Sequence, residues 1–226
     1  MAGSRKASSV ATKRRTTTSH EFADHWELAD LVKNPVMNFD GYLKELGAKV
    51  SRFEAARERL SPSMPEQEFQ DLLKLSEQLT AESSRLSAYS YLWFSEDTKH
   101  LQARSFKQKV EEQLTALHNR LLFFDLWWQS VDDKNAERLK ARSGDFRYHL
   151  DTIRRFKPHT LSEPEEKIIN VKNTTGRSAV HQLYDVVTNG FTFTLTIGGK
   201  KKTVNREALM AYLRSPKPVQ REAAYR

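Results

Sequence analysis

Apolar residues between positions 40 and 130 recur at steps of three and four, which is the period of helices that bury one face. The first run covers about 40–60 and stops at Ser61-Pro62, because proline disfavours helical continuation. A second run extends over about 65–95 and a third over about 97–130. Three helices of this length, joined by short connections, predict an elongated antiparallel bundle.

The second run carries two rows of residues with the same seven-residue period. Large apolar residues form one row, at Leu72, Leu79, Leu86 and Trp93. Small residues form the adjoining row, at Ser76, Ser83 and Ser90. Small beside large predicts a packing groove into which a neighbouring helix fits closely. A serine-lined polar channel is the alternative.

The third run ends in LLFFDLWW at 121–128, which is apolar on more than one face. A helix end of this kind is expected to be enclosed on several sides, by other helices of this chain or by further protein. Aromatic rings could also stack on a ligand, but core packing is the favoured interpretation.

Shorter elements follow residue 130. Asp132-Asp133 and Ser143-Gly144 bracket one short helix, and 146–156 forms another that Pro158 ends. Three basic residues near the end of this second helix either complement its dipole or bind an anionic partner; these are Arg154, Arg155 and Lys157.

Residues 161–187 predict two short helices joined by a polar turn. Ser162 and Glu165 have the spacing of a capping box at the start of the first helix. The polar stretch 173–176, NTTG, interrupts the pattern. A new apolar stripe then follows at three- and four-residue spacing, formed by Val180, Leu183, Tyr184 and Val187.

The segment from Phe191 to Val204 predicts a β-hairpin. Residues 191–197 alternate between apolar residues and threonine, and Gly198-Gly199 supplies a tight turn before the returning strand. An isolated hairpin is marginal in water, so its apolar face requires a cover. Asn205 is expected to cap a further helix, and a last one after Ser215-Pro216 runs to the end with no stop signal, as if it continued. The expected fold is mainly α: a long antiparallel helical bundle, then shorter helices and this one hairpin.

The composition limits the expected location of the protein and the classes of partner that it can bind. There is no cysteine, which excludes disulfides and thiolate metal sites. No apolar run is long enough to span a membrane, and the first twenty residues lack the apolar core of a secretion signal, so a cytoplasmic location is expected. Five of the eight net positive charges precede Glu21, which leaves the remainder nearly balanced. No base-reading motif is present, and we expect no specific nucleic-acid partner.

These patterns divide the chain into three parts. Residues 1–20 form a disordered basic tail, 21–130 the long-helix bundle, and 131–226 the short helices with the hairpin.

Candidate catalytic chemistry is sparse. His20 and His25 flank a glutamate but lie five residues apart, which turns the second imidazole about 100° off the first on a helix and prevents joint chelation of zinc. Four other histidines stand singly on predicted helices, namely His100, His118, His149 and His181. No catalytic or metal-binding residue is therefore assigned, and the substrate-binding residues stay unknown.

Three segments resemble the oligoendopeptidase F (M3) family of zinc metallopeptidases: LSEPEEKIINVKNTTGRSAVHQLYDVV at 161–187, its lead-in YHLDTIRRFKPHT at 148–160, and SPKPVQREAAYR at 215–226. WELADL, from Trp26, fits the family's usual opening, so the resemblance extends from there to the last residue. It identifies the chain as similar to the N-terminal portion only.

The resemblance implies an enzyme that hydrolyses short peptides with a zinc-activated water. Such enzymes bind zinc through His-Glu-x-x-His in a C-terminal half, a motif that this sequence lacks. The chain is then expected to form a wall of the substrate cleft, with an oligopeptide and the C-terminal half as its partners. When isolated, the chain is expected to be inactive and to bind no zinc. The resemblance also implies that an edge strand of the hairpin binds extended peptide. The alternative is a non-catalytic helical scaffold or adaptor derived from such a peptidase.

Overall fold

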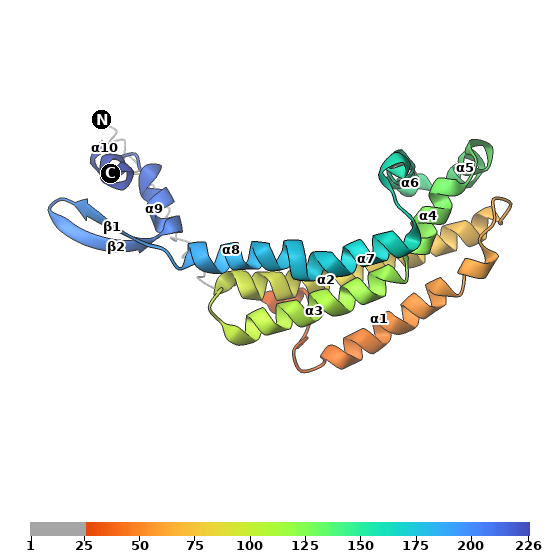
Figure 1. The fold of residues 1–226 in the computed structure, drawn as a ribbon, viewed down its shortest axis with the longest axis horizontal. Coiled ribbons are helices and arrows are strands. Elements are labelled where there is room, and N and C mark those ends of the chain that lie inside the picture. Colours follow the sequence, from red (N-terminus) through yellow and green to blue (C-terminus); the bar gives the residue numbers. More distant parts are fainter. Residues whose placement is uncertain (1–25) are drawn as a thin grey trace, which may run out of the picture.

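The computed structural model describes residues 26–226, which fold into helices and one two-stranded sheet (Figure 1). The helices are α1 Phe39–Glu54, α2 Glu66–Glu96, α3 Leu101–Asn119, α4 Leu122–Ser130, α5 Asp133–Lys140, α6 Arg147–Arg155, α7 Glu163–Asn173, α8 Ala179–Asn189, α9 Arg206–Leu213 and α10 Pro218–Tyr225. The strands are β1 Thr192–Ile197 and β2 Lys200–Asn205. The fold is therefore mainly α with one hairpin, as the sequence predicts. The domain boundaries stay a prediction, and the predicted tail at 1–20 lies outside the described residues.

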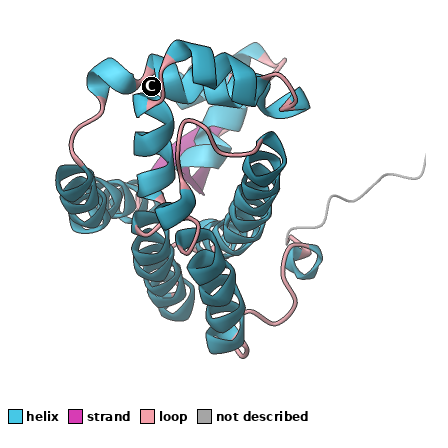
Figure 2. Ribbon diagram, turned by 90° about the vertical axis from the view of Figure 1, so that its right-hand side faces the viewer, coloured by secondary structure: helices cyan, strands magenta, loops and turns pink. Residues whose placement is uncertain are grey.

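Helices α1, α2 and α3 lie side by side and form the bundle (Figures 1 and 2). Its core continues into α4, whose rings pack against those of α1 and α2. The Phe53 and Phe124 ring centroids are 5.4 Å apart, and those of Phe69 and Trp128 are 5.1 Å apart. Trp128 is fully buried, and its indole N–H donates to the Leu150 carbonyl at 2.9 Å. The aromatic end of the third apolar run is thus core, the favoured interpretation.

The prediction of one unbroken third helix is wrong. The helix ends at Asn119, and α4 begins at Leu122 in a new direction (Figure 1). Asn119 is buried and bonded to the long helix beside it, accepting from Asn170 Nδ2 at 2.8 Å. Arg120 binds Glu54 on α1 at 2.6 Å. These tertiary bonds hold the chain in a bend that the apolar period does not reveal.

The predicted turn at 173–176 is also wrong. Helix α7, a π-helical segment at Thr174–Ser178 and α8 form one continuous helix (Figure 1). Asn173 and Thr174 both keep right-handed helical backbone angles. The segment packs against α3, and this packing outweighs the weak local preference of the polar residues for a turn. The predicted capping box at the start of α7 is confirmed, since the Glu165 carboxylate accepts from the Ser162 amide at 2.9 Å.

The hairpin with α9 and α10 stands at one end of the molecule, joined to the bundle by α8 (Figure 1). Phe193 pairs with Val204 and Thr194 with Thr203 in an uninterrupted register. Leu195 and Val204 are buried, and α9 and α10 pack against the strands. The apolar face is thereby covered within this chain. Asn205 caps α9 as predicted, because its side chain accepts from the Ala208 amide at 2.9 Å.

Candidate functional site

An open groove of about 1080 Å³ lies between the bundle and the long helix α7–α8. Helix α2 lines it mainly with serines, α3 with both charged and apolar residues, and the long helix with amides, an arginine and a histidine. Lining residues used below are Ser83, Ser90, Lys107, Glu111, His118, Asn170, Arg177, His181 and Asp185. Ser83 and Ser90 of the predicted small-residue row line this groove, and Ser90 is buried.

The groove has the chemistry of a binding surface. Lys107 and Glu111 form an ion pair of 3.5 Å on α3, and Asn170 is bonded to Asn119. The Ser90 hydroxyl donates to the Ser87 carbonyl at 2.9 Å. Within residues 26–226, no hydrogen bond joins a serine to a histidine, so the groove shows no nucleophile with an adjacent base. Its serines, amides and charges can hold a polar ligand or a partner surface.

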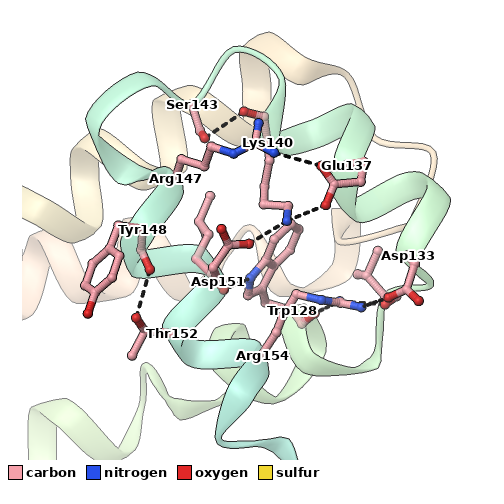
Figure 3. Close-up of polar contacts among 12 residues, drawn as sticks. Trp128, Asp133, Glu137, Lys140, Ser143, Arg147, Tyr148, Asp151, Thr152 and Arg154 are labelled. Atoms are coloured by element: carbon pink, nitrogen blue, oxygen red, sulfur yellow. Dashed lines mark hydrogen bonds and ion pairs between the residues drawn. The ribbon is translucent and has the colours of Figure 1, made fainter.

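A second polar cluster joins α5 and α6 (Figure 3). The Lys140 ammonium is only 6% exposed and lies 2.5 Å from Asp151 Oδ1 and 2.6 Å from Glu137 Oε1. Burial lowers the pKa of Lys140, but its hydrogen bonds to these two carboxylates outweigh burial and raise that pKa overall. The same bonds lower the pKa values of Asp151 and Glu137. Every charge here has a protein partner, which indicates a structural role.

Arg154 completes this cluster from α6 (Figure 3). Its guanidinium donates to the Trp128 carbonyl at 2.9 Å and the Val131 carbonyl at 2.6 Å, and it pairs with Asp133 at 2.7 Å. Arg154 therefore satisfies carbonyls at the end of α4, while it and Arg155 also lie in the last turn of α6, where the sequence predicted basic residues. Arg155 and Lys157 border the shallow depression beside the cluster.

The histidines are dispersed over the fold. His100 caps α3, because its Nδ1 accepts from the Ala103 amide at 3.1 Å; no sequence pattern predicted this role. His118 and His149 lie near Asp125, whose pKa is raised by burial and lowered in part by both imidazoles. His181 borders the groove. The His20 and His25 pair lies outside the described residues.

The described residues do not fit a zinc site. Nowhere in 26–226 do three His, Asp or Glu side chains gather closely enough to hold a metal ion. The helices described here also include none long and apolar enough to cross a membrane.

The fold is a helical bundle joined by one long helix to a hairpin module, with a groove between the bundle and that helix. Residues 127–193, from α4 to the start of β1, match the family model described as Oligopeptidase F, of the N-terminal M3 peptidase type. The match confirms the resemblance to the N-terminal portion of the oligoendopeptidase F family over this segment. It contains the Lys140 cluster, the capping box and the whole of α7–α8.

One solved structure is distantly similar to this chain. A crystal structure from Chlamydophila abortus, described as a "putative peptidase", aligns with 89% of this chain at 16% identity and a TM-score of 0.43. The aligned part covers 34% of that protein, so this chain spans about one third of its length. No curated protein matches the chain.

The uneven distribution of charge between residues 21–189 and 190–226 was not predicted from the sequence. Residues 190–226 contain eight lysines and arginines but only Glu207 and Glu222, a formal net charge of +6. Residues 21–189 consequently have a net charge of −3. The small net charge of residues 21–226 is therefore the sum of an acidic region and a basic region. Counting charges separately over shorter segments of the sequence shows both regions.

Proposed function

We propose that this chain is the N-terminal segment of an oligoendopeptidase F-like zinc metalloendopeptidase, which hydrolyses short peptides. The observation that carries the proposal is an uncovered apolar stripe on α8, within the segment that matches the family. The stripe consists of Val180, Leu183, Tyr184 and Val187, which are between 48% and 66% exposed.

The stripe has the spacing of a buried helix face, i, i+3, i+4 and i+7, yet it faces outward. Fully burying one such side chain contributes about 1.5–3 kcal/mol, so more than half of that stabilisation is not realised on α8. Further exposed apolar residues, Ile168 and Val171, precede it on α7. The occupant that we propose is the C-terminal half of the enzyme, which would also supply the zinc ligands and the residues for acid–base catalysis.

In this arrangement the present chain provides shape. The long helices and the groove beside α7–α8 form one wall of a cleft, and restricted access to it favours short, extended peptides over folded proteins. Cytoplasmic oligopeptides are the proposed substrates. The isolated 226-residue chain is expected to bind no stoichiometric zinc and to cleave no peptide.

The first test is the mass of the natural polypeptide in its own cells, with zinc analysis of the purified product. A polypeptide well above 26.2 kDa that contains one zinc and cleaves oligopeptides supports the proposal. A natural product of 26.2 kDa without peptidase activity refutes it and favours the non-catalytic scaffold.

A further inference from the structure

The hairpin presents a free polar face at one end of the molecule (Figure 1). Successive side chains of a strand point to opposite sides, and the buried Leu195 marks the side on which α9 and α10 pack. On the opposite side, Thr194 of β1 lies across from Thr203 of β2, and Thr196 lies across from Lys201. All four of these residues are exposed, so no other described residue covers this face.

The module that contains this face, residues 190–226, carries positive charge that carboxylates do not neutralise. Its two acidic residues are Glu207 and Glu222, and Glu222 is paired with Arg226. Within residues 26–226, the other seven cations of the module form no ion pair: Lys200, Lys201, Lys202, Arg206, Arg214, Lys217 and Arg221. Uncompensated positive charge at this density attracts polyanions.

The shape of the hairpin selects among polyanions. Six-residue strands extend about 20 Å, and two paired strands are narrow enough to enter the major groove of duplex DNA, which is about 12 Å wide. The major groove of duplex RNA is too deep and narrow for side chains to read. Single strands usually stack their bases on aromatic rings, and the free face of the hairpin has none. A membrane surface usually also takes up apolar side chains, which this face lacks as well.

From this geometry we propose that the threonine face of the hairpin enters the major groove of duplex DNA while the cations of the module bind phosphates on either side. Phosphate oxygens accept hydrogen bonds from lysine, arginine and threonine side chains, which are the groups that the module exposes. Such contacts do not depend on base sequence, which agrees with the expected absence of a specific nucleic-acid partner. The proposal concerns a surface of this chain alone and does not rest on the peptidase function proposed above.

The test is fluorescence anisotropy with the 226-residue chain and a labelled DNA duplex about two helical turns long. One strand of this DNA alone and an RNA duplex of the same length are the comparison probes, and vesicles of phosphatidylcholine with phosphatidylserine test membrane binding by sedimentation. We expect the DNA duplex to bind at least about tenfold more tightly than either comparison probe, with a logarithm of affinity that falls linearly with the logarithm of salt concentration. The vesicles should not sediment the chain.

The first pair of variants tests the phosphate contacts. Lys200→Gln with Lys201→Gln removes two cations beside the free face, and should weaken binding about tenfold and lower the salt slope by about 2. Lys74→Gln with Lys99→Gln removes the same charge from exposed positions of the bundle. This control should leave both the affinity and the slope unchanged.

The second pair of variants tests the free face itself. Thr194→Glu places a carboxylate in the middle of β1 on that face, and should weaken binding about tenfold or more through repulsion of the phosphates. Ala211→Glu adds the same charge at an exposed position of α9, within the same module, and should have a much smaller effect. Both positions are exposed, so neither substitution buries a charge.

Four results would overturn the proposal. The basic tail is the binding site if serine at all five basic positions of residues 1–20 abolishes binding while Lys200→Gln with Lys201→Gln has no effect. General attraction by charge is indicated if all three nucleic acids bind equally. The free face is not the contact if Thr194→Glu and Ala211→Glu weaken binding equally. Sedimentation with the vesicles, without binding of the DNA duplex, would show that the module binds a membrane surface.

Discussion

Replacing Val180 and Tyr184 by glutamine tests the uncovered face of α8 directly. The two side chains are 66% and 55% exposed, so this chain realises less than half of the stabilisation that their burial can give. That fraction is worth about 1 kcal/mol per residue, and the better helix propensity of glutamine offsets part of its loss. The free energy of unfolding of the isolated chain should therefore fall by about 2 kcal/mol or less in urea denaturation.

The same double variant should have a larger effect on what the face binds. The unrealised part of the burial energy is about 1–2 kcal/mol per residue, so a covering partner should bind roughly 30-fold or more weakly. In the isolated chain the corresponding signal is lower binding of a hydrophobic dye and less self-association in sedimentation. Tyr148→Gln is the matched control, since Tyr148 is 74% exposed but lies on α6.

Two results would refute this reasoning. A loss of several kcal/mol in the free energy of unfolding would show that α8 is packed in the isolated chain. Equal dye binding by the double variant, the control and the parent chain would show that the stripe is not an adhesive surface.

Three further predictions concern stability. Lys140→Met should lower the free energy of unfolding by about 1–3 kcal/mol at pH 7, because it removes the ion-pair partner of Asp151. The pKa of Asp151 is lowered in the folded state, so the stabilisation by this ion pair disappears as the pH falls through that pKa. Urea denaturation should therefore show a smaller difference between the variant and the parent chain in acid. Asp125→Asn should stabilise the chain at pH 7, because burial raises the pKa of Asp125 in the folded state. A carboxyl group with a raised pKa makes the folded state less stable as the pH rises above the ordinary carboxyl pKa. The gain in stability should therefore vanish below the ordinary carboxyl pKa in the same assay. Trp128→Phe should cost about 1–3 kcal/mol, measured by thermal or urea unfolding, since it leaves the Leu150 carbonyl without its indole donor.

Local signals predicted the ends of several elements correctly. Asp132 caps α5, with its carboxylate accepting from the Asn135 amide at 3.0 Å, and Asn205 caps α9 in the same way. The hairpin followed from Gly198-Gly199 and the alternation before it. Each of these features depends on residues within a few positions of one another, which is why the sequence alone reveals them.

Tertiary contacts explain the predictions that failed. Arg120 marks the end of the third helix because it reaches Glu54, 66 residues earlier in the chain. The stretch 173–176 stays helical because α3 lies beside it. These partners lie far away in the sequence and cannot be identified from local spacing. The end of the third helix and the continuity of the helix through 173–176 could therefore not be predicted.

The candidate surfaces show the same division between local and tertiary information. The spacing of Val180, Leu183, Tyr184 and Val187 predicted an apolar stripe, but periodicity alone implies only that the stripe is buried somewhere. The structure adds that the groove lies on the other side of this helix, which leaves the stripe largely exposed; only Leu183, at its margin, also borders a depression between α3 and α8. One helix thus separates a groove of mixed polar and apolar lining from an exposed apolar stripe, and the family match covers its whole length. Both surfaces therefore lie in the segment on which the proposed contact with the C-terminal half rests.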